Sequence, residues 1–164
     1  MERLIFDILE EPKGEIYQGL LDYAIAYCET ALLVVGHHSK FSTAGQHVLQ
    51  ALSPFLKHEV ESHEWPGTRM LWDTALVLQY QYGPELATIL KGAADRLYSW
   101  QQPDLPEDLS LLRQDGEPWL VTIAHENDSY LKLSREELEH LFEALPAFRS
   151  MVKERVDSSS AGRV

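Results

Sequence analysis

The sequence predicts an α+β fold in a single domain, in which helices pack on a mixed sheet that ends in an antiparallel three-stranded meander. Three observations predict this fold: apolar residues at helical spacing, one uninterrupted apolar run, and short strands separated by polar turns. The 164 residues are close to the usual length of one domain. We expect the domain to span residues 1–156, and the small polar residues of 157–164 to form a flexible tail.

The first part of the chain predicts two strands and two helices. Residues 4–8 are a short apolar run that favours a strand over a helix. Residues 15–30 carry apolar side chains at three- and four-residue spacing, which predicts a helix with Cys28 on its buried side. Residues 31–36 are an uninterrupted aliphatic run, which predicts a central strand covered on both faces. A second helix is expected from Ser42.

The middle of the chain predicts strands, a turn and a helix. Residues 58–65 have an irregular strand-like pattern. Residues 65–68 then place proline second and glycine third, as a type II turn prefers. Within residues 74–82, leucine and tyrosine side chains alternate with alanine, valine and glutamine side chains, which predicts a long strand. Pro84 suits the first turn of a helix, and we expect that helix to end near Trp100.

The C-terminal part predicts the meander and a helix that closes it. Residues 108–113 and 118–125 flank an Asp-Gly pair, which favours a hairpin with a tight primed turn. Residues 129–133 follow a second polar turn and add a third strand. Ser134 and Glu137 have the spacing of a capping box, which predicts the start of a helix.

The chain is strongly acidic, and its charge limits the partners that we expect. It has 14 lysine and arginine residues against 26 aspartate and glutamate residues, a formal net charge of −12. This charge opposes contact with phosphate backbones and anionic headgroups, so neither nucleic acid nor a membrane is expected as a partner. The apolar runs are too short to span a bilayer, and acids flank the N-terminal run where a secretory signal needs bases. A cytoplasmic location is therefore expected.

The usual signatures of phosphate binding, activated nucleophiles and metal sites do not occur in the sequence. No cofactor and no metal ion are therefore expected. A non-enzymatic protein is favoured, although catalytic groups can also assemble from distant segments.

Histidine and carboxylate residues cluster around the turn after the second meander strand. An alternative function, a small metal-binding protein or a hydrolase, would use His125, Glu126 and Asp128 there, with His63 as a further member. Neighbours on a regular strand point to opposite faces, so His125 and Glu126 converge only if the turn departs from strand geometry. A polar hairpin end without a site is the simpler interpretation.

Two further histidines, His37 and His38, follow the predicted central strand. Ligands often bind beyond the carboxyl ends of strands in open α/β sheets. No glycine-rich phosphate loop follows them, and a solvated loop is the simpler interpretation.

A binding site is predicted at Trp65, with Glu64 and Thr68 as its neighbours. Tryptophan is enriched in the energetic centres of interfaces, and Trp65 stands beside a turn among polar residues. Trp119, by contrast, is expected in the core, on the same strand face as Val121.

Three strings resemble a family of small bacterial proteins that often carries the label stage III sporulation protein AH and has no assigned activity. They are EWPGT (64–68), the segment from 106 to 141, and LLDYAIAYC (20–28). This resemblance implies a bacterial, soluble, single-domain protein. It does not imply the ring-forming role of the membrane-anchored sporulation protein, because no run in this sequence suits an anchor. The final meander and helix are also similar, at the level of fold, to immunity proteins that neutralise bacterial toxins.

The charge, the missing catalytic signatures and Trp65 together favour a non-enzymatic module that binds a protein partner, one of basic charge, through an acidic surface. This interpretation expects the polar side chains to lie scattered over the molecule rather than to converge in one pocket.

Overall fold

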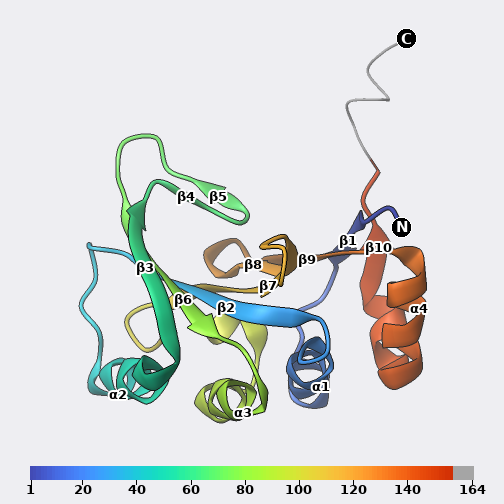
Figure 1. Ribbon diagram of the computed structural model, residues 1–164, viewed down its shortest axis with the longest axis horizontal. Coiled ribbons are helices and arrows are strands. Elements are labelled where there is room, and N and C mark those ends of the chain that lie inside the picture. The colour runs from blue at the N-terminus through green and yellow to red at the C-terminus, as the bar shows by residue number, and fades with distance from the viewer. Residues whose placement is uncertain (157–164) are drawn as a thin grey trace.

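Eight strands form one sheet in the computed structural model, which describes residues 1–156 (Figure 1). The order of the strands is β10-β1-β9-β8-β7-β2-β6-β3, and every neighbouring pair is antiparallel. They are β1 (Leu4–Ile8), β2 (Cys28–Val35), β3 (Leu56–Ser62), β6 (Ala75–Gln81), β7 (Glu107–Arg113), β8 (Pro118–Ile123), β9 (Asp128–Leu133) and β10 (Val152–Glu154). The predicted tail, 157–164, lies outside the described residues.

The α+β prediction is confirmed, but the sheet is antiparallel rather than mixed. A helix connects β1 to β2, which run in the same direction. Three strands, β9, β8 and β7, lie between them and alternate in direction, so no two parallel strands become neighbours. The chain from β7 to β9 forms consecutive antiparallel neighbours in the middle of the sheet.

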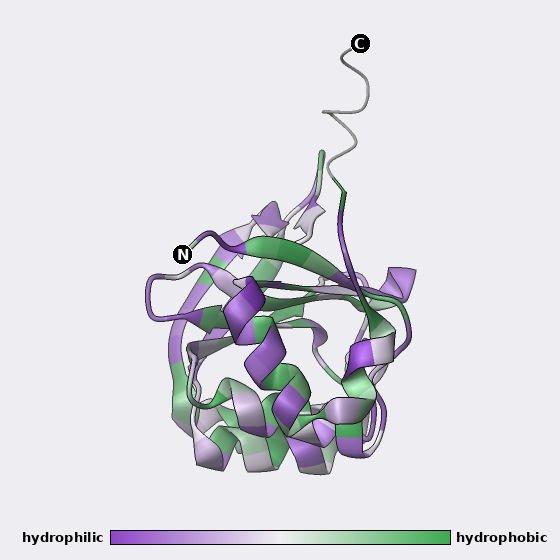
Figure 2. Ribbon diagram, turned by 90° about the vertical axis from the view of Figure 1, so that its right-hand side faces the viewer, coloured by the Kyte–Doolittle hydropathy of each residue, from purple (hydrophilic) through white to green (hydrophobic). Residues whose placement is uncertain are grey.

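Three helices cover one face of the sheet, and a fourth lies near β10 (Figure 1). The helices are α1 (Glu15–Ala24), α2 (Thr43–Leu52), α3 (Pro84–Ala93) and α4 (Arg135–Ala144), with short 3-10 segments η1 (Ser53–Phe55), η2 (Leu97–Ser99), η3 (Ala124–Glu126) and η4 (Pro146–Met151). In Figure 2, hydrophobic residues follow the strands, and the helix ribbons alternate between hydrophobic and hydrophilic residues. The capping box of Ser134 and Glu137 is present at the start of α4, as predicted.

The main core lies between the sheet and α1, α2 and α3, and several of its large aromatic side chains have hydrogen-bond partners. The Trp100 indole donates to the Tyr17 hydroxyl at 3.0 Å, and that hydroxyl donates to the Leu90 carbonyl at 2.6 Å. The Tyr82 hydroxyl donates to the Leu21 carbonyl at 2.5 Å. The core therefore buries large aromatic rings without leaving these polar tips unpaired.

Two predicted helices end earlier than expected. The helix predicted for 15–30 ends at Ala24, and Cys28 begins β2, because residues 28–30 also alternate between buried and exposed as a strand does. Cys28 is buried, as predicted, and burial raises the pKa of its thiol to about 12. The helix from Pro84 ends at Ala93, and the following chain instead bonds to residues 12–14.

The hairpin of β7 and β8 differs from the prediction at its turn and at Trp119. Only Gly116 has a positive φ in this turn, whereas a primed type I turn needs two such residues. A register shift between β7 and β8 places Trp119 in the main core, stacked on Tyr23 of α1 and on Tyr27, which lies between α1 and β2. Its core position is confirmed, but the strand face predicted to be shared with Val121 is wrong.

A two-stranded hairpin lies over the other face of the sheet (Figure 1). It consists of β4 (Glu64–Trp65) and β5 (Thr68–Arg69), joined at Pro66 and Gly67. Gly67 has a φ of 84°, as the predicted type II turn requires. A Cβ atom at Gly67 would lie 2.9 Å from side-chain atoms of Ile123 and Val121, so the turn packs directly on β8.

Replacing Gly67 by alanine is expected to lower the free energy of unfolding by about 2–5 kcal/mol. The left-handed backbone costs a residue with a Cβ atom ~1–2 kcal/mol, and overpacking against β8 costs ~1–3 kcal/mol. Urea denaturation measures the effect. The matched control is Gly92→Ala in α3, where a Cβ atom meets open space and is expected to stabilise by about 0.5–1 kcal/mol. An unchanged unfolding midpoint for Gly67→Ala would show that the hairpin does not pack on β8.

Candidate functional site

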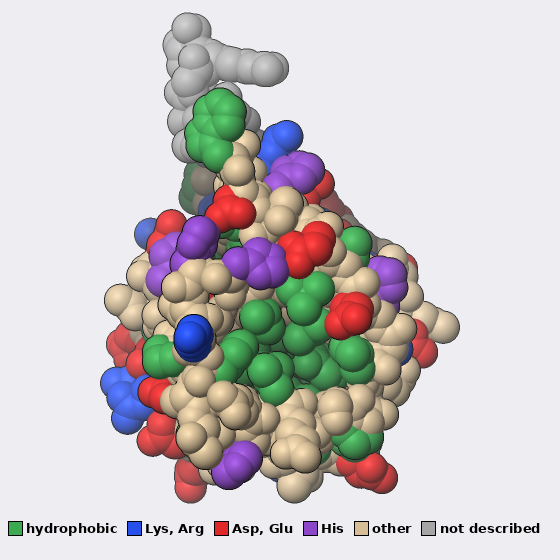
Figure 3. Space-filling view, turned by 90° about the vertical axis from the view of Figure 1, so that its left-hand side faces the viewer, with side chains coloured by type: hydrophobic (Ala, Val, Ile, Leu, Met, Phe, Trp, Pro, Cys, Tyr) green, Lys and Arg blue, Asp and Glu red, His purple; other side chains and the backbone are tan. Residues whose placement is uncertain are grey.

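A half-open pocket of about 320 Å³ lies between the loop after β2, the β4–β5 hairpin and the start of β7. We call it the histidine pocket; residues that line it include His37, His38, His125, Trp65, Glu107 and Asp108. Figure 3 shows the face of the molecule that is on the left in Figure 1, where histidine side chains lie close to carboxylates. The expectation that polar side chains lie scattered is wrong for this part of the molecule.

The strand order explains why residues far apart in the sequence meet in this pocket. β7 lies between β2 and β8 and is antiparallel to both. The end of β2 and the end of β8 therefore both lie beside the start of β7. His37 and His38 follow β2, His125 follows β8, and Glu107 and Asp108 begin β7.

Asp108 is the most deeply buried carboxylate of the pocket, with 2% of its surface exposed. Its Oδ1 accepts a hydrogen bond from the backbone N–H of Ala124 at 3.0 Å, and its Oδ2 accepts one from the indole Nε1 of Trp65 at 3.1 Å. Burial raises the pKa of Asp108, and these two hydrogen bonds act in the opposite direction. Asp108 thus ties the hairpin and the end of β8 to β7.

Glu107 is half-buried beside Asp108, and no lysine or arginine within residues 1–156 pairs with it. Burial raises its pKa, and the neighbouring charge of Asp108 raises it further. No ion pair of the described residues includes Glu107 or Asp108, and neither lysine nor arginine lines the histidine pocket. Two adjacent carboxyl groups therefore face a cavity that offers them no balancing lysine or arginine.

Two histidine–carboxylate pairs hold the loop after β2 at the edge of the pocket. The Nε2 atom of His37 lies 2.9 Å from Oε2 of Glu61, which also accepts a hydrogen bond from the Thr74 hydroxyl at 3.0 Å. The Nε2 atom of His38 lies 2.5 Å from Oδ2 of Asp73. We call these two contacts the rim pairs. They connect the loop to β3 and to the segment before β6.

The rim pair of His37 and Glu61 is expected to stabilise the fold within a limited pH window. Its hydrogen bond raises the pKa of His37 above the ordinary 6.5 and lowers that of Glu61 below the ordinary 4.5. The contribution of His37 is complete below pH 6.5 and is lost as pH rises through the folded pKa. The contribution of Glu61 is present above pH 4.5 and is lost as pH falls through its folded pKa.

The pH dependence of unfolding in His37→Gln tests this window. The destabilisation relative to wild type is expected to be largest at about pH 5.5 and to decline on both sides. His47→Gln, an exposed residue of α2, serves as the control and should show no such maximum. A destabilisation that is constant from about pH 4 to pH 8 would contradict the pairing.

The structure brings only some residues of the predicted metal or acid–base cluster together. His125 lines the histidine pocket, whereas His63 lines a different hollow beside Trp72. Glu126 is exposed, with an oxygen 3.8 Å from Nε2 of His125, and Asp128 is half-buried at the start of β9. Within residues 1–156 no three His, Cys, Asp or Glu side chains are grouped so that they could hold a metal ion.

The predicted binding residues are only partly in the pocket. Trp65 and Thr68 line it, whereas Glu64 is exposed and is the cross-strand neighbour of Arg69. Trp65 is half-buried and bonded to Asp108, so its ring forms a wall rather than a projecting anchor. Sequence reasoning missed Glu107 and Asp108, although two acids at the start of an otherwise buried apolar strand were a usable signal.

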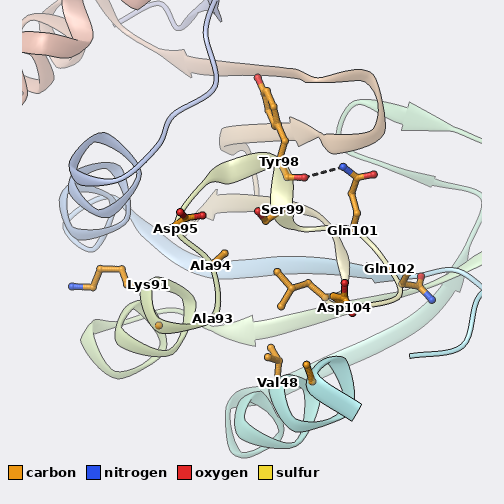
Figure 4. Close-up of a pocket in the computed structure, with 13 residues that line it drawn as sticks. Val48, Lys91, Ala93, Ala94, Asp95, Tyr98, Ser99, Gln101, Gln102 and Asp104 are labelled. Carbon is orange, nitrogen blue, oxygen red and sulfur yellow. Dashed lines mark hydrogen bonds between the residues drawn. The ribbon is translucent and has the colours of Figure 1, made fainter. Parts of the chain in front are cut away.

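A larger hollow of about 720 Å³ lies between α2, α3 and the segment that follows α3 (Figure 4). Several of its polar side chains already have partners within the chain. Lys91 binds Asp22 at 2.7 Å, and the Gln101 amide donates to the carbonyls of Tyr98 and Ala124. Its one lysine, Lys91, is therefore already paired with a carboxylate of the described chain.

Comparison of the chain with protein-family models, curated proteins and solved structures finds no match. No helix within residues 1–156 is both long and apolar enough to cross a membrane.

Proposed function

We propose that the protein is a non-enzymatic interaction module that binds a basic protein partner, and that one cationic side chain of this partner enters the histidine pocket. The observation that carries the proposal is the pair of adjacent carboxyl groups, Glu107 and Asp108, in a pocket that no lysine or arginine of residues 1–156 lines. A cation beside them would favour their ionised forms and offset the cost of their burial.

The remaining walls of the pocket suit a long cationic side chain. Val34, Met70 and Trp65 offer apolar surface for its aliphatic stem. The indole ring of Trp65 can also attract a cation through its face. A volume of about 320 Å³ is at the lower end for ligand pockets and suits one side chain rather than a large cofactor. Arginine is favoured over lysine, because a guanidinium group is more weakly hydrated.

The charge of the whole chain supports a basic partner. A formal net charge of −12 attracts a basic protein over distances comparable to the Debye length and raises the rate of encounter. The likeness to immunity proteins that the sequence leads us to expect would imply the same class of partner, because an acidic surface suits a basic toxin.

Binding of small arginine probes tests the proposal. We expect N-acetyl-arginine methylamide to shift the indole N–H resonance of Trp65, and the neutral citrulline analogue to bind at least about tenfold more weakly, or ~1.4 kcal/mol. Glu107→Gln should reduce arginine binding to a similar extent, whereas Glu126→Gln, an exposed residue outside the pocket lining, should not. Equal binding of arginine and citrulline would overturn the proposal.

One observation favours a second candidate, a small hydrolase. Burial raises the pKa of Glu107, and a carboxylic acid of this kind can act as a general acid beside the imidazole of His125. Hydrolysis of simple ester or glycoside substrates that is lost in Glu107→Gln and retained in Glu126→Gln would support this candidate over the binding module.

A further inference from the structure

The edge strand β3 is the longest open edge of the sheet. It ends the strand order, and all of its seven residues are exposed except Ser62, which is half-buried. The opposite edge strand, β10, has only three residues. Within residues 1–156 no strand pairs with the outer side of β3, so its backbone N–H and C=O groups there can accept a further strand.

The two faces of β3 differ in chemistry. The register with β6 places Glu59 opposite Leu78 and Glu61 opposite Leu76, so both carboxylates share one face. Val60 lies on the other face, opposite Val77, and 44% of its surface is exposed.

This pattern disfavours pairing between two copies of the chain. Within the regular part of β3, residues 58–62, the antiparallel registers that pair at least three residues of each copy are centred on Glu59, Val60 or Glu61. A register centred on Val60 sets Glu59 opposite Glu61 of the other copy. A register centred on Glu59 sets Glu59 opposite Glu59 of the other copy, and one centred on Glu61 does the same for Glu61. Like charges directly opposite one another destabilise a strand pair.

From this edge we propose that β3 accepts an extended segment of the partner as an additional strand, with lysine or arginine at alternate positions opposite Glu59 and Glu61 and an apolar residue between them. Strand addition supplies backbone hydrogen bonds, and the alternate side chains supply specificity. This inference rests on the proposed function only for the basic character of the partner.

The position of Glu61 connects this edge with the histidine pocket. Glu61 contacts His37 and Thr74, and both of these residues line the pocket. A segment that runs along β3 towards Ser62 therefore approaches the pocket rim. One partner can thus extend the sheet and insert a cationic side chain in neighbouring places.

Hydrogen exchange of the β3 backbone amides tests strand addition directly. The probe is a short blocked peptide that alternates lysine with valine; one control replaces lysine by glutamate, and another carries N-methyl groups on alternate amides. We expect the lysine peptide to slow exchange in residues 56–62 at least about tenfold, and neither control peptide to do so. Absence of slowed exchange at saturating peptide, or equal effects of the N-methylated peptide, would overturn the inference.

Charge variants separate strand addition from capture in the pocket. Glu59→Lys is expected to weaken the lysine peptide about tenfold, whereas Glu10→Lys, an exposed residue that follows β1, should leave it unchanged. Unweakened binding to Glu59→Lys would contradict the assigned charge pairing. If the lysine peptide protects β3 but the arginine and citrulline probes bind equally, the pocket proposal fails and strand addition stands. If arginine binds more tightly than citrulline but β3 is not protected, strand addition alone is rejected.

Discussion

Replacing Glu137 by alanine is expected to lower the free energy of unfolding by about 3–5 kcal/mol, because it leaves a buried arginine without its counter-charge. The Arg113 side chain is only 9% exposed, and it donates hydrogen bonds of 2.9 and 3.1 Å to the two carboxylate oxygens of Glu137. Glu137 also accepts from the backbone N–H of Ser134 in the capping box of α4. Chemical denaturation measures the loss.

The matched control for this prediction is Glu136→Ala. Glu136 is exposed in the same first turn of α4, so its removal tests the helix terminus without touching Arg113. We expect it to cost less than about 1 kcal/mol. Equal destabilisation by the two variants would show that the ion pair with Arg113 adds no stability beyond that of a negative charge at the start of α4.

The pH dependence of the Glu137 effect follows from its pKa. Burial opposes ionisation of Glu137, but the hydrogen bonds from Arg113 and Ser134 outweigh it and hold the pKa below its ordinary value of 4.5. The stabilisation is therefore present above pH 4.5 and is lost as pH falls through the folded pKa. The difference between wild type and Glu137→Ala should shrink as the solution is acidified below this value.

Replacing Asp108 by alanine is expected to destabilise the protein by about 3–5 kcal/mol and to loosen the hairpin over the histidine pocket. The change leaves the N–H groups of Ala124 and Trp65 without acceptors, at ~1–3 kcal/mol for each buried group. It also places alanine at a φ of 57°, a left-handed conformation that aspartate and asparagine tolerate better. Urea denaturation and the indole N–H resonance of Trp65 report the two effects.

Asp108→Asn separates the loss of the hydrogen-bond acceptors from the strain of the left-handed backbone. Asparagine keeps the shape, tolerates the backbone and retains one acceptor, so we expect a cost of about 1–3 kcal/mol. Asp104→Ala, an exposed residue of the preceding loop, should have little effect. An alanine variant at position 108 that is as stable as the asparagine variant would contradict the role given to the hydrogen bonds and the backbone.

Local patterns in the sequence predicted much of the fold. The uninterrupted run at 31–36 and the alternation at 74–82 both became strands of the sheet, and the turn at Gly67 has its expected backbone. Element ends were less predictable, because an apolar residue such as Cys28 fits both the periodicity of the preceding helix and the alternation of the next strand. Tertiary pairing decided between them.

The candidate site depended on information that local patterns do not contain. His37, His125 and Asp108 are far apart in the sequence and meet only because β2 and β8 both end beside the start of β7. Strand order and register arise from the whole chain, so spacing alone gave no reason to connect these residues. The cluster that the sequence predicted around Glu126 lies partly outside the pocket.

Titration of the side-chain carbon resonance of Glu107, with and without the arginine probe, measures most directly whether this carboxyl group recognises a cation. We predict a pKa above the ordinary value of 4.5 in the free protein, and a lower pKa when the probe is bound. A pKa at or below 4.5 in the free protein, or one that the bound probe leaves unchanged, would contradict the claim that an unbalanced carboxyl group in this pocket recognises a cation.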